Sequence, residues 1–255
     1  MAVIAVFNQK GGVGKTTTCL NVTAALNIAQ QSPIAMDMDP QGHLTLASGV
    51  GRTAPDSGMV AFFKHKTPLS SLLQETPAGW QIIPSSLELS KIDAMFGSDP
   101  KAATLLRQAL HDGDSGLTSA PILIDCCPML GVLTLNALLA TDRVLIPVSA
   151  DFLSLQGVYR LDSALNVLEK KLNRKFERRI VVTRFDTRRK LAYDIYEKLR
   201  ARYGALVCET RIGETVGLAT SPMHGKDVFD FAPNSPGAAD YRALTQELWD
   251  SGFFV

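Results

Sequence analysis

Short runs of apolar and β-branched residues recur along the chain and alternate with segments whose apolar residues are spaced for a helix. Several of these runs are apolar throughout, which is typical of strands in a parallel sheet buried on both faces. We predict strands at Val3–Phe7, Ile34–Met38, Trp80–Ile83, Ile122–Ile124, Arg143–Val148, Ile180–Thr183 and Ala205–Cys208. The alternation predicts an α/β fold, a doubly wound and mostly parallel sheet with helices on both faces.

Helical spacing is clearest in two segments, Leu155–Leu172 and Leu191–Tyr203. In the second segment we expect Leu191, Ile195 and Leu199 to line one face. Residues 49–79 and 111–121 are richer in Gly, Pro, Ser and Thr, and we interpret them as connections. Neither is long enough to separate two domains.

At 255 residues the chain fits one α/β domain, which we assign to residues 1–255. Its 26 basic and 25 acidic side chains give a net charge of +1, so the whole molecule shows no sign of a nucleic-acid partner. The four cysteines form no C-x-x-C pair and no zinc-like cluster, and no run of about 18 apolar residues occurs. These features predict a cytoplasmic protein that does not span a membrane.

A glycine-rich loop, Lys10–Thr17, follows the first predicted strand and precedes a helix-like segment, Thr18–Ala29. Small residues let the backbone wrap an anion there, and the N–H groups and dipole of the helix favour negative charge. Lys15 would reach the β- and γ-phosphates of a nucleotide, and the Thr16 hydroxyl suits Mg²⁺. A chance glycine-rich turn is the alternative. The residues expected to contact phosphate are Gly11, Gly12, Val13, Gly14, Lys15, Thr16 and Thr17.

The loop departs from the common phosphate-loop pattern, because Gln9 stands where the first glycine is usual. With its additional lysine, Lys10, the sequence Lys10-Gly11-Gly12-Val13-Gly14-Lys15-Thr16-Thr17 resembles the deviant Walker A box of the ParA/MinD family of ATPases. The resemblance implies a P-loop ATPase with ATP and Mg²⁺ as cofactors. It also implies a homodimer that sandwiches two ATP molecules, in which Lys10 crosses to the partner's phosphates.

Two acidic segments resemble the switches of that family. In Asp37-Met38-Asp39-Pro40-Gln41-Gly42, the resemblance implies that Asp39 positions the attacking water, Asp37 supports the metal shell and Gln41 orders the switch. An ordinary Asp-Pro-x-Gly turn is the alternative. The segment Ile122-Leu123-Ile124-Asp125-Cys126-Cys127-Pro128 resembles the Walker B strand and second switch, which implies that Asp125 holds Mg²⁺ through water. A carboxylate that ends a buried apolar strand needs a cation or hydrogen bonds. A helix cap is the alternative for Asp125. The catalytic set implied is Lys10, Lys15 and Asp39.

The resemblance extends along nearly the whole chain. Thr183, Arg184 and the loop at 212–215 fall where relatives contact adenine, although Gly213-Glu214-Thr215 replaces the usual Pro-Arg-Asn. The second switch has Cys127 where the family usually has proline.

Charge is unevenly distributed, and this bears on what the ATP is used for. Residues 170–202 contain 13 Lys and Arg against four acids, a charge of +9 that leaves −8 on the rest. Clustered basic residues are the footprint of sequence-independent DNA binding, and ParA-like relatives bind DNA as dimers. A solvated helix face is the alternative. The residues we assign to non-specific double-stranded DNA are Arg188, Arg189, Lys190, Lys198 and Arg202.

The function predicted is an ATPase that binds the nucleoid and segregates a plasmid or chromosome or positions a protein cargo. An activating or cargo-adaptor protein is expected from the family. The alternatives are a MinD-like or regulatory ATP switch acting on a membrane or protein partner without DNA, and a metabolic P-loop enzyme. No membrane partner is expected, because residues 246–255 contain two acids and a glycine rather than a cationic amphipathic helix. An iron–sulfur carrier would need cysteine ligands at suitable spacing.

Overall fold

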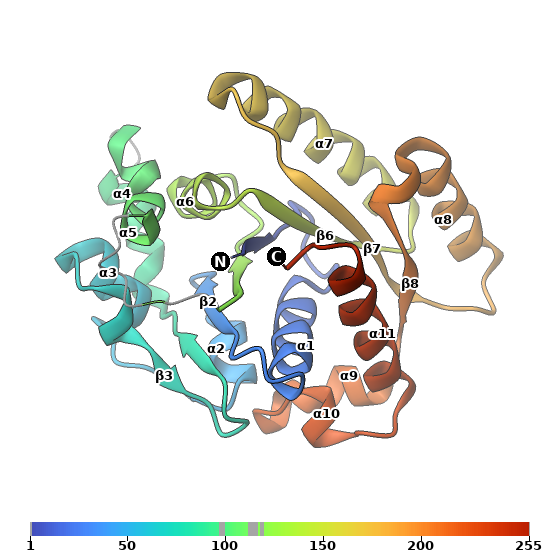
Figure 1. The fold of residues 1–255 in the computed structure, drawn as a ribbon, viewed down its shortest axis with the longest axis horizontal. Helices are drawn as coiled ribbons and strands as arrows, with labels where there is room; N and C mark the ends of the chain where they lie inside the picture. Colours follow the sequence, from blue (N-terminus) through green and yellow to red (C-terminus); the bar gives the residue numbers. More distant parts are fainter. Residues whose placement is uncertain (1, 97–99, 112–116, 118–119, 255) are drawn as a thin grey trace.

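The structure is a computed structural model that describes residues 2–96, 100–111, 117 and 120–254. Within these residues eight strands form one sheet in the order β3-β4-β2-β5-β1-β6-β7-β8 (Figure 1). All neighbouring strands are parallel except the edge pair β3 and β4. The strands are β1 Val3–Val6, β2 Ile34–Met38, β3 Gln74–Glu75, β4 Gln81–Ile83, β5 Ile122–Cys126, β6 Arg143–Ser149, β7 Glu177–Phe185 and β8 Val207–Gly213. The predicted α/β class is confirmed.

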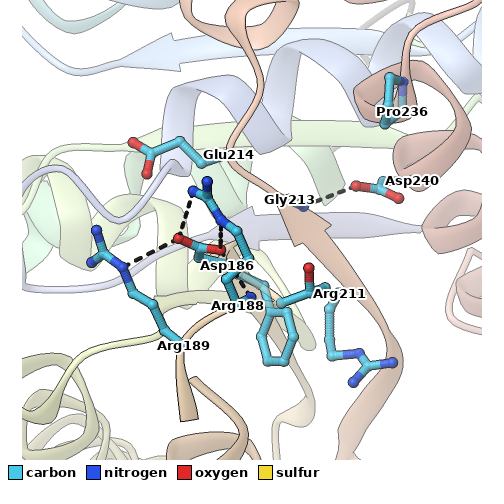
Figure 2. A pocket seen from close by; sticks show the side chains of 10 residues that line it. Asp186, Arg188, Arg189, Arg211, Gly213, Glu214, Pro236 and Asp240 are labelled. Atoms are coloured by element: carbon cyan, nitrogen blue, oxygen red, sulfur yellow. Dashed lines mark hydrogen bonds and ion pairs between the residues drawn. The ribbon is translucent and has the colours of Figure 1, made fainter. Parts of the chain in front are cut away.

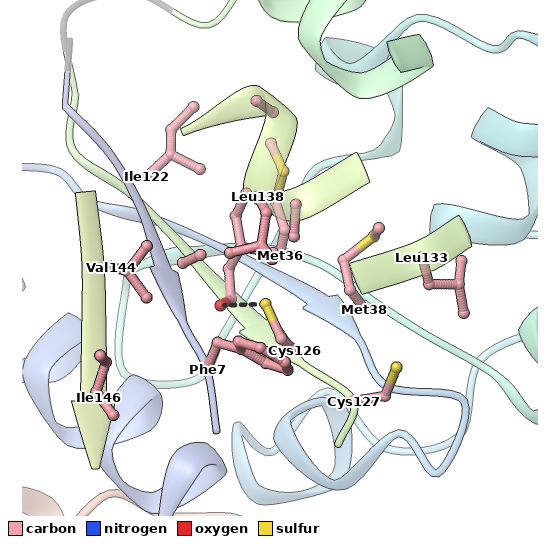
Figure 3. Close-up of a cluster of buried hydrophobic side chains, with 14 of the residues drawn as sticks. Phe7, Met36, Met38, Ile122, Cys126, Cys127, Leu133, Leu138, Val144 and Ile146 are labelled. Carbon is pink, nitrogen blue, oxygen red and sulfur yellow. Dashed lines mark hydrogen bonds between the residues drawn. The ribbon is translucent and has the colours of Figure 1, made fainter. Parts of the chain in front are cut away.

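Helices cover both faces of this sheet. The α-helices are α1 Lys15–Ile28, α2 His43–Ala47, α3 Gly58–His65, α4 Ser90–Phe96, α5 Leu105–His111, α6 Val132–Ala140, α7 Phe152–Leu172, α8 Lys190–Tyr203, α9 Val216–Thr220, α10 Val228–Phe231 and α11 Pro236–Asp250. One core lies under α3 to α8, and a second lies under α1, α2 and α9 to α11. Figure 3 shows the first core, where Phe7, Met36, Met38 and Cys126 pack together. Strand β5 is buried at every position, as a central parallel strand requires.

Strands β7 and β8 differ from the predicted ranges. Strand β7 begins three residues earlier than expected because Arg178 is buried rather than solvated, with ion pairs to Asp162 and Glu169. A 3₁₀ turn at Gly204–Leu206 occupies the predicted start of the last strand, so β8 begins at Val207 and runs on to Gly213.

One helix face was also predicted wrongly. In α8 the buried residues are Ala192, Ile195 and Leu199, whereas Leu191 is 51% exposed. The buried positions of α8 repeat every three or four residues. Ala192 rather than Leu191 begins this buried face, because Leu191 lies about 100° away around the helix.

The interpretation of residues 49–79 as a plain connection was wrong. The segment contains α3, a 3₁₀ turn at Leu69–Leu72 and the edge strand β3, which pairs antiparallel with β4. Burial of Met59, Val60, Phe62 and Phe63 explains why α3 forms within a Gly- and Pro-rich stretch. Most of the second predicted connection, 111–121, lies outside the described residues.

The sheet gathers polar groups at the carboxyl ends of its central strands. In the parallel register Asp37 of β2 lies beside Asp125 of β5, and Asp125 lies beside Val6 of β1. The loop after β1 leaves from the middle of this edge, which is where open α/β sheets bind ligands. Near the other end of the chain Phe253 and Phe254 are buried, so this apolar segment packs on the core.

Candidate nucleotide-binding site

The glycine-rich loop has the backbone geometry that the sequence predicted. Gly12 and Gly14 have φ angles of +74° and +85°, a left-handed conformation that side chains disfavour. Gly14 precedes α1, whose first residue is the buried Lys15. The hydroxyl of Thr183 donates to the Val13 carbonyl at 2.8 Å and ties the loop to β7. The start of α1 is therefore held in place, and a helix N-terminus of this kind suits an anion.

Thr16 and Asp125 meet at the base of the loop. The Thr16 hydroxyl donates to Asp125 Oδ2 at 2.7 Å. The other carboxylate oxygen, Oδ1, is buried and has no hydrogen-bond partner among the described residues. Burial, and then the nearby charge of Asp37, raises the pKa of Asp125 well above its usual value.

An unpaired buried acceptor beside a threonine hydroxyl is a suitable partner for Mg²⁺. This ion commonly takes one or two protein oxygens and completes its shell with water and phosphate oxygens. The part of the chain that the structure describes has no group of three or more His, Cys, Asp or Glu that could hold a metal without such help. Thr16 and Asp125 therefore fit an ion that arrives with a nucleotide.

The predicted first switch is anchored rather than open. Asp37 Oδ2 accepts hydrogen bonds from the Thr45 backbone at 2.8 Å and hydroxyl at 2.7 Å, while Oδ1 accepts from the Asp39 backbone. Asp37 thus joins the switch to α2, and both of its carboxylate oxygens accept hydrogen bonds within the subunit. Burial raises the pKa of Asp37 to about 6 despite these bonds. Asp39 is half-buried and accepts from the Gln41 backbone at 2.9 Å, and the Gln41 side chain is exposed.

Lys10 is held within its own subunit. Its Nζ donates to both carboxylate oxygens of Asp151, at 2.8 and 3.0 Å, and to the Ser154 hydroxyl at 2.7 Å. Asp151 also caps α7 by accepting from the Ser154 backbone. Although burial alone would raise it, the pKa of Asp151 lies well below its usual range because Lys10, Ser154 and Ser149 donate to the carboxylate.

The sequence analysis did not identify Asp151 and Ser154. The available signal was their position just after β6, at the same sheet edge as the loop and the switches. The Asp151-x-x-Ser154 spacing is typical of a helix cap and indicates a structural role only. The fold brings the pair to Lys10.

The residues predicted to contact the base surround a cavity of about 260 Å³. It begins at Gly12, Gly14 and Thr17 of the loop and extends to Thr183 and Arg184 at the end of β7. The lining on the far side is Ile212, Gly213, Glu214, Thr215, Leu218, Ala219 and Tyr241. The loop and the predicted base residues thus form one continuous site.

The second switch has buried thiols. Cys126 and Cys127 pack in the core under α6, and burial raises the pKa of both. Cys127 lies 3.2 Å from the Thr134 hydroxyl, which ties the switch to α6. Protonated, enclosed thiols of this kind are inert, so the geometry favours packing over thiol chemistry.

The basic segment divides into structural and exposed residues. Arg174 and Arg178 are held in ion pairs with Asp142, Asp162 and Glu169. The side chains assigned to DNA are exposed, and they are Arg188, Arg189, Lys190, Lys198 and Arg202.

Their arrangement is not uniform. Arg188 and Arg189 both pair with Asp186 on the rim of a cavity of about 610 Å³ (Figure 2). Lys190 begins α8, and Arg202 lies over the Tyr159 ring at 4.4 Å. The structure therefore brings the first three side chains together at the start of α8 and leaves Lys198 and Arg202 further along that helix.

The site is that of a P-loop nucleotide-binding protein. It has a glycine loop at a helix N-terminus, a buried lysine, and a threonine bonded to an aspartate whose other oxygen has no partner in the described residues. A family model described as "AAA domain" matches residues 1–178. The chromosome-partitioning ATPase Soj of Thermus thermophilus is 38% identical over 246 residues, which cover 96% of this chain and 94% of that protein. The chromosome partitioning protein ParA of Caulobacter vibrioides is 32% identical over 97% of this chain and 94% of its own length.

The solved structures agree with this class. Cobyrinic acid a,c-diamide synthase from Mycobacterium smegmatis, with bound ATP analogue and magnesium, superposes with a TM-score of 0.81. It is 28% identical, and the match covers 99% of this chain and 97% of that one. The chain belongs to the ParA/MinD family of ATPases and is ParA-like.

Proposed function

We propose that this protein is a ParA-type switch that forms an ATP-sandwich dimer, binds DNA non-specifically and uses hydrolysis to segregate DNA or position a protein cargo. ATP and Mg²⁺ are its cofactors. The observation that carries the proposal is Lys10, a second lysine beside the phosphate loop that lies at the surface with about a third of its side chain exposed. The partitioning functions of the Soj and ParA relatives support the cellular role.

Each site residue then has a chemical task. Backbone N–H groups from Gly11 to Thr17 and the Lys15 ammonium would bind the phosphates. Thr16 and Asp125 would hold Mg²⁺, which would supply neutralising charge. Asp39 orients the attacking water. Lys10 leaves Asp151 and stabilises the charge that develops in the partner's site. Slow hydrolysis, stimulated by a partner protein, would make the dimer a timer.

DNA binding is assigned to the exposed basic residues at the start of α8. Arg188 and Arg189 share one carboxylate, Asp186, so their two charges are only partly neutralised. The two guanidinium groups are exposed although Asp186 is mostly buried, so both can contact DNA phosphates. Release of counterions from DNA then favours binding.

The two alternative functions differ from the proposed one in what the protein would bind, either lipid or a small substrate. A MinD-like protein would use an amphipathic end to bind lipid, whereas Phe253 and Phe254 are packed in the core here. No helix in the described residues is long and apolar enough to cross a bilayer. A metabolic ligase of the kind named for the Mycobacterium smegmatis structure would release ADP only with its small substrate.

Charge reversal tests the DNA assignment. Arg188→Glu with Arg189→Glu should abolish retention on non-specific DNA and leave ATP binding unchanged. The matched control is Lys170→Glu with Lys171→Glu, two exposed lysines at the end of α7. Each lost phosphate contact should lower the salt slope of binding by about one. Equal retention by both double variants would contradict the assignment.

A further inference from the structure

Ser85 lies beside the first switch and is almost completely buried, with 3% of its surface exposed. It follows β4 at the carboxyl edge of the sheet, where β4 neighbours β2. The Ser85 hydroxyl donates to the Asp39 carbonyl at 2.7 Å, and the Ser85 backbone N–H donates to the Thr45 hydroxyl at 2.9 Å. Ser85 thus holds both the switch and the helix α2 that follows it.

The backbone of Asp39 is bonded at both of its polar atoms. Its N–H donates to Asp37 Oδ1 at 3.1 Å, and its carbonyl accepts from the Gly42 N–H at 2.9 Å as well as from Ser85. The bonds with Asp37 and Gly42 connect close neighbours along the chain. Among the described residues, the Ser85 hydroxyl makes the one hydrogen bond from this backbone to a distant part of the chain. Ser85 therefore fixes the turn at Asp39 against the neighbouring strand.

A second connection from Ser85 uses its backbone rather than its side chain. The Thr45 hydroxyl accepts from the Ser85 N–H and donates to Asp37 Oδ2 at 2.7 Å. Replacement of the Ser85 side chain leaves this connection in place. We therefore expect such a replacement to act on Asp39 and to leave the anchoring of Asp37 unchanged.

The loop that carries Ser85 has supports of its own. Pro84 restricts the backbone before it, and the Pro84 carbonyl accepts from the Met59 N–H of α3 at 2.9 Å. The Thr53 hydroxyl donates to the Ser85 carbonyl at 2.9 Å. The switch itself is less enclosed, because a cavity of about 480 Å³ borders residues 40–42. Hydrogen bonds more than side-chain packing hold this side of the switch.

We propose that Ser85 is a positioning residue for ATP hydrolysis, whose hydroxyl holds Asp39 where the carboxylate orients the attacking water. The proposal rests on the role of Asp39 in the proposed function. Orientation of a reacting group lowers the barrier only while that group is held closely in place, so its displacement lowers the rate. Ser85 is separate from the residues that line the cavity beside the phosphate loop, so nucleotide affinity should not depend on it.

Acid-quenched hydrolysis at saturating MgATP tests the proposal, because it measures bond cleavage before product release. For Ser85→Ala we expect the rate constant to fall about fivefold, the change that corresponds to one net hydrogen bond. Its affinity for a fluorescent ATP analogue and its dimer in sedimentation velocity should match the wild type. Ser85→Thr keeps the hydroxyl, and the adjoining cavity has room for the added methyl group, so the rate should be restored.

The matched control is Ser48→Ala. Ser48 is also a buried serine, and its hydroxyl donates to the Thr45 carbonyl at 2.8 Å, at the end of α2 away from Asp39. Its variant should keep the wild-type rate. Ser85→Cys has nearly the shape of serine but is a weaker donor, so its rate should lie between those of the wild type and Ser85→Ala.

A double variant separates positioning from a general loss of structure. In an Asp39→Ala background, Ser85→Ala should cause no further fall in rate, because Ser85 acts through Asp39. A wild-type rate in Ser85→Ala, an equal fall in Ser48→Ala, or a loss of ATP affinity in place of rate would overturn the proposal. Wild-type hydrolysis by Asp39→Ala alone would instead remove the role of Asp39, which is a failure of the proposed function and is distinct from the other outcomes.

Discussion

Removal of the charge at Asp125 should stabilise the nucleotide-free protein and abolish its response to magnesium. The residue is 1% exposed, lies beside Asp37 in the sheet register, and has one oxygen without a partner. A buried carboxylate charge costs several kcal/mol, whereas a neutral amide group left buried and unpaired costs about 1–3 kcal/mol. Asp125→Asn removes the charge and keeps an oxygen that can accept from Thr16.

The expected gain at pH 7.5 is about 2 kcal/mol, which corresponds to a rise in Tm of about 4–8 °C for a chain of this size. Bound nucleotide adds to the stability of the wild type. At a hundred times its Kd, MgATP should stabilise the wild type by about 2.7 kcal/mol. In Asp125→Asn the magnesium-dependent part of that shift should vanish, because the neutral amide is a poor partner for the ion.

The pH dependence has a definite sign. Burial raises the pKa values of Asp37, to about 6, and of Asp125 above their unfolded values near 4. The native state then binds protons more tightly than the unfolded state. The contribution of the pair to stability is full below pH 4 and is lost as the pH rises through about 6 and above. Asp125→Asn should flatten this dependence.

Thermal unfolding at pH 5.5 and 7.5, with and without ATP and magnesium, measures all three effects. Asp194→Asn, an exposed aspartate on α8, is the control for loss of a carboxylate. The reasoning would be refuted if Asp125→Asn lowered the Tm of the nucleotide-free protein at pH 7.5 and kept the full response to magnesium.

Three further predictions concern the dimer and the thiols. Lys10→Ala should bind ATP but remain a monomer in sedimentation velocity, and a dimer of wild-type stability would exclude its action in trans. Asp151→Asn keeps an acceptor for the cap of α7 but weakens the ion pair with Lys10. With about 0.7 kcal/mol for a partly exposed ion pair in each of two subunits, the ATP-dependent dimer should tighten about tenfold. A weaker dimer would contradict the release of Lys10. Cys126 should resist alkylation at pH 8 until the protein unfolds, because burial raises the pKa of its thiol. Mass spectrometry measures the alkylation, and rapid modification of the native protein would show that the second switch exposes this thiol.

The phosphate loop and the central strands were predictable because their signals are local. Gly12 and Gly14 indicate the loop, and the apolar run before Asp125 indicates the strand β5. An aspartate at the end of such a strand needs a cation or hydrogen bonds, which is why Asp125 could be named from sequence as a candidate magnesium ligand.

Long-range pairing accounts for what was missed. Lys10 and Asp151 are 141 residues apart, and no pattern in either segment indicates their contact. The predicted strand began at Ile180 and left out Arg178, because a charge is expected to be solvated unless its partners are known. The helix α3 was hidden by its Gly- and Pro-rich surroundings, although its Met and Phe residues form a core face.

Retention on non-specific double-stranded DNA tests the central claim most directly. Wild-type protein would be measured with a hydrolysis-resistant ATP analogue, with ADP and without nucleotide, across a series of salt concentrations. The account predicts retention with the ATP analogue only, falling steeply as salt rises because counterion release drives binding. Equal retention in all three states, or none in a sample that the analogue has made dimeric, would contradict an ATP-gated DNA-binding switch.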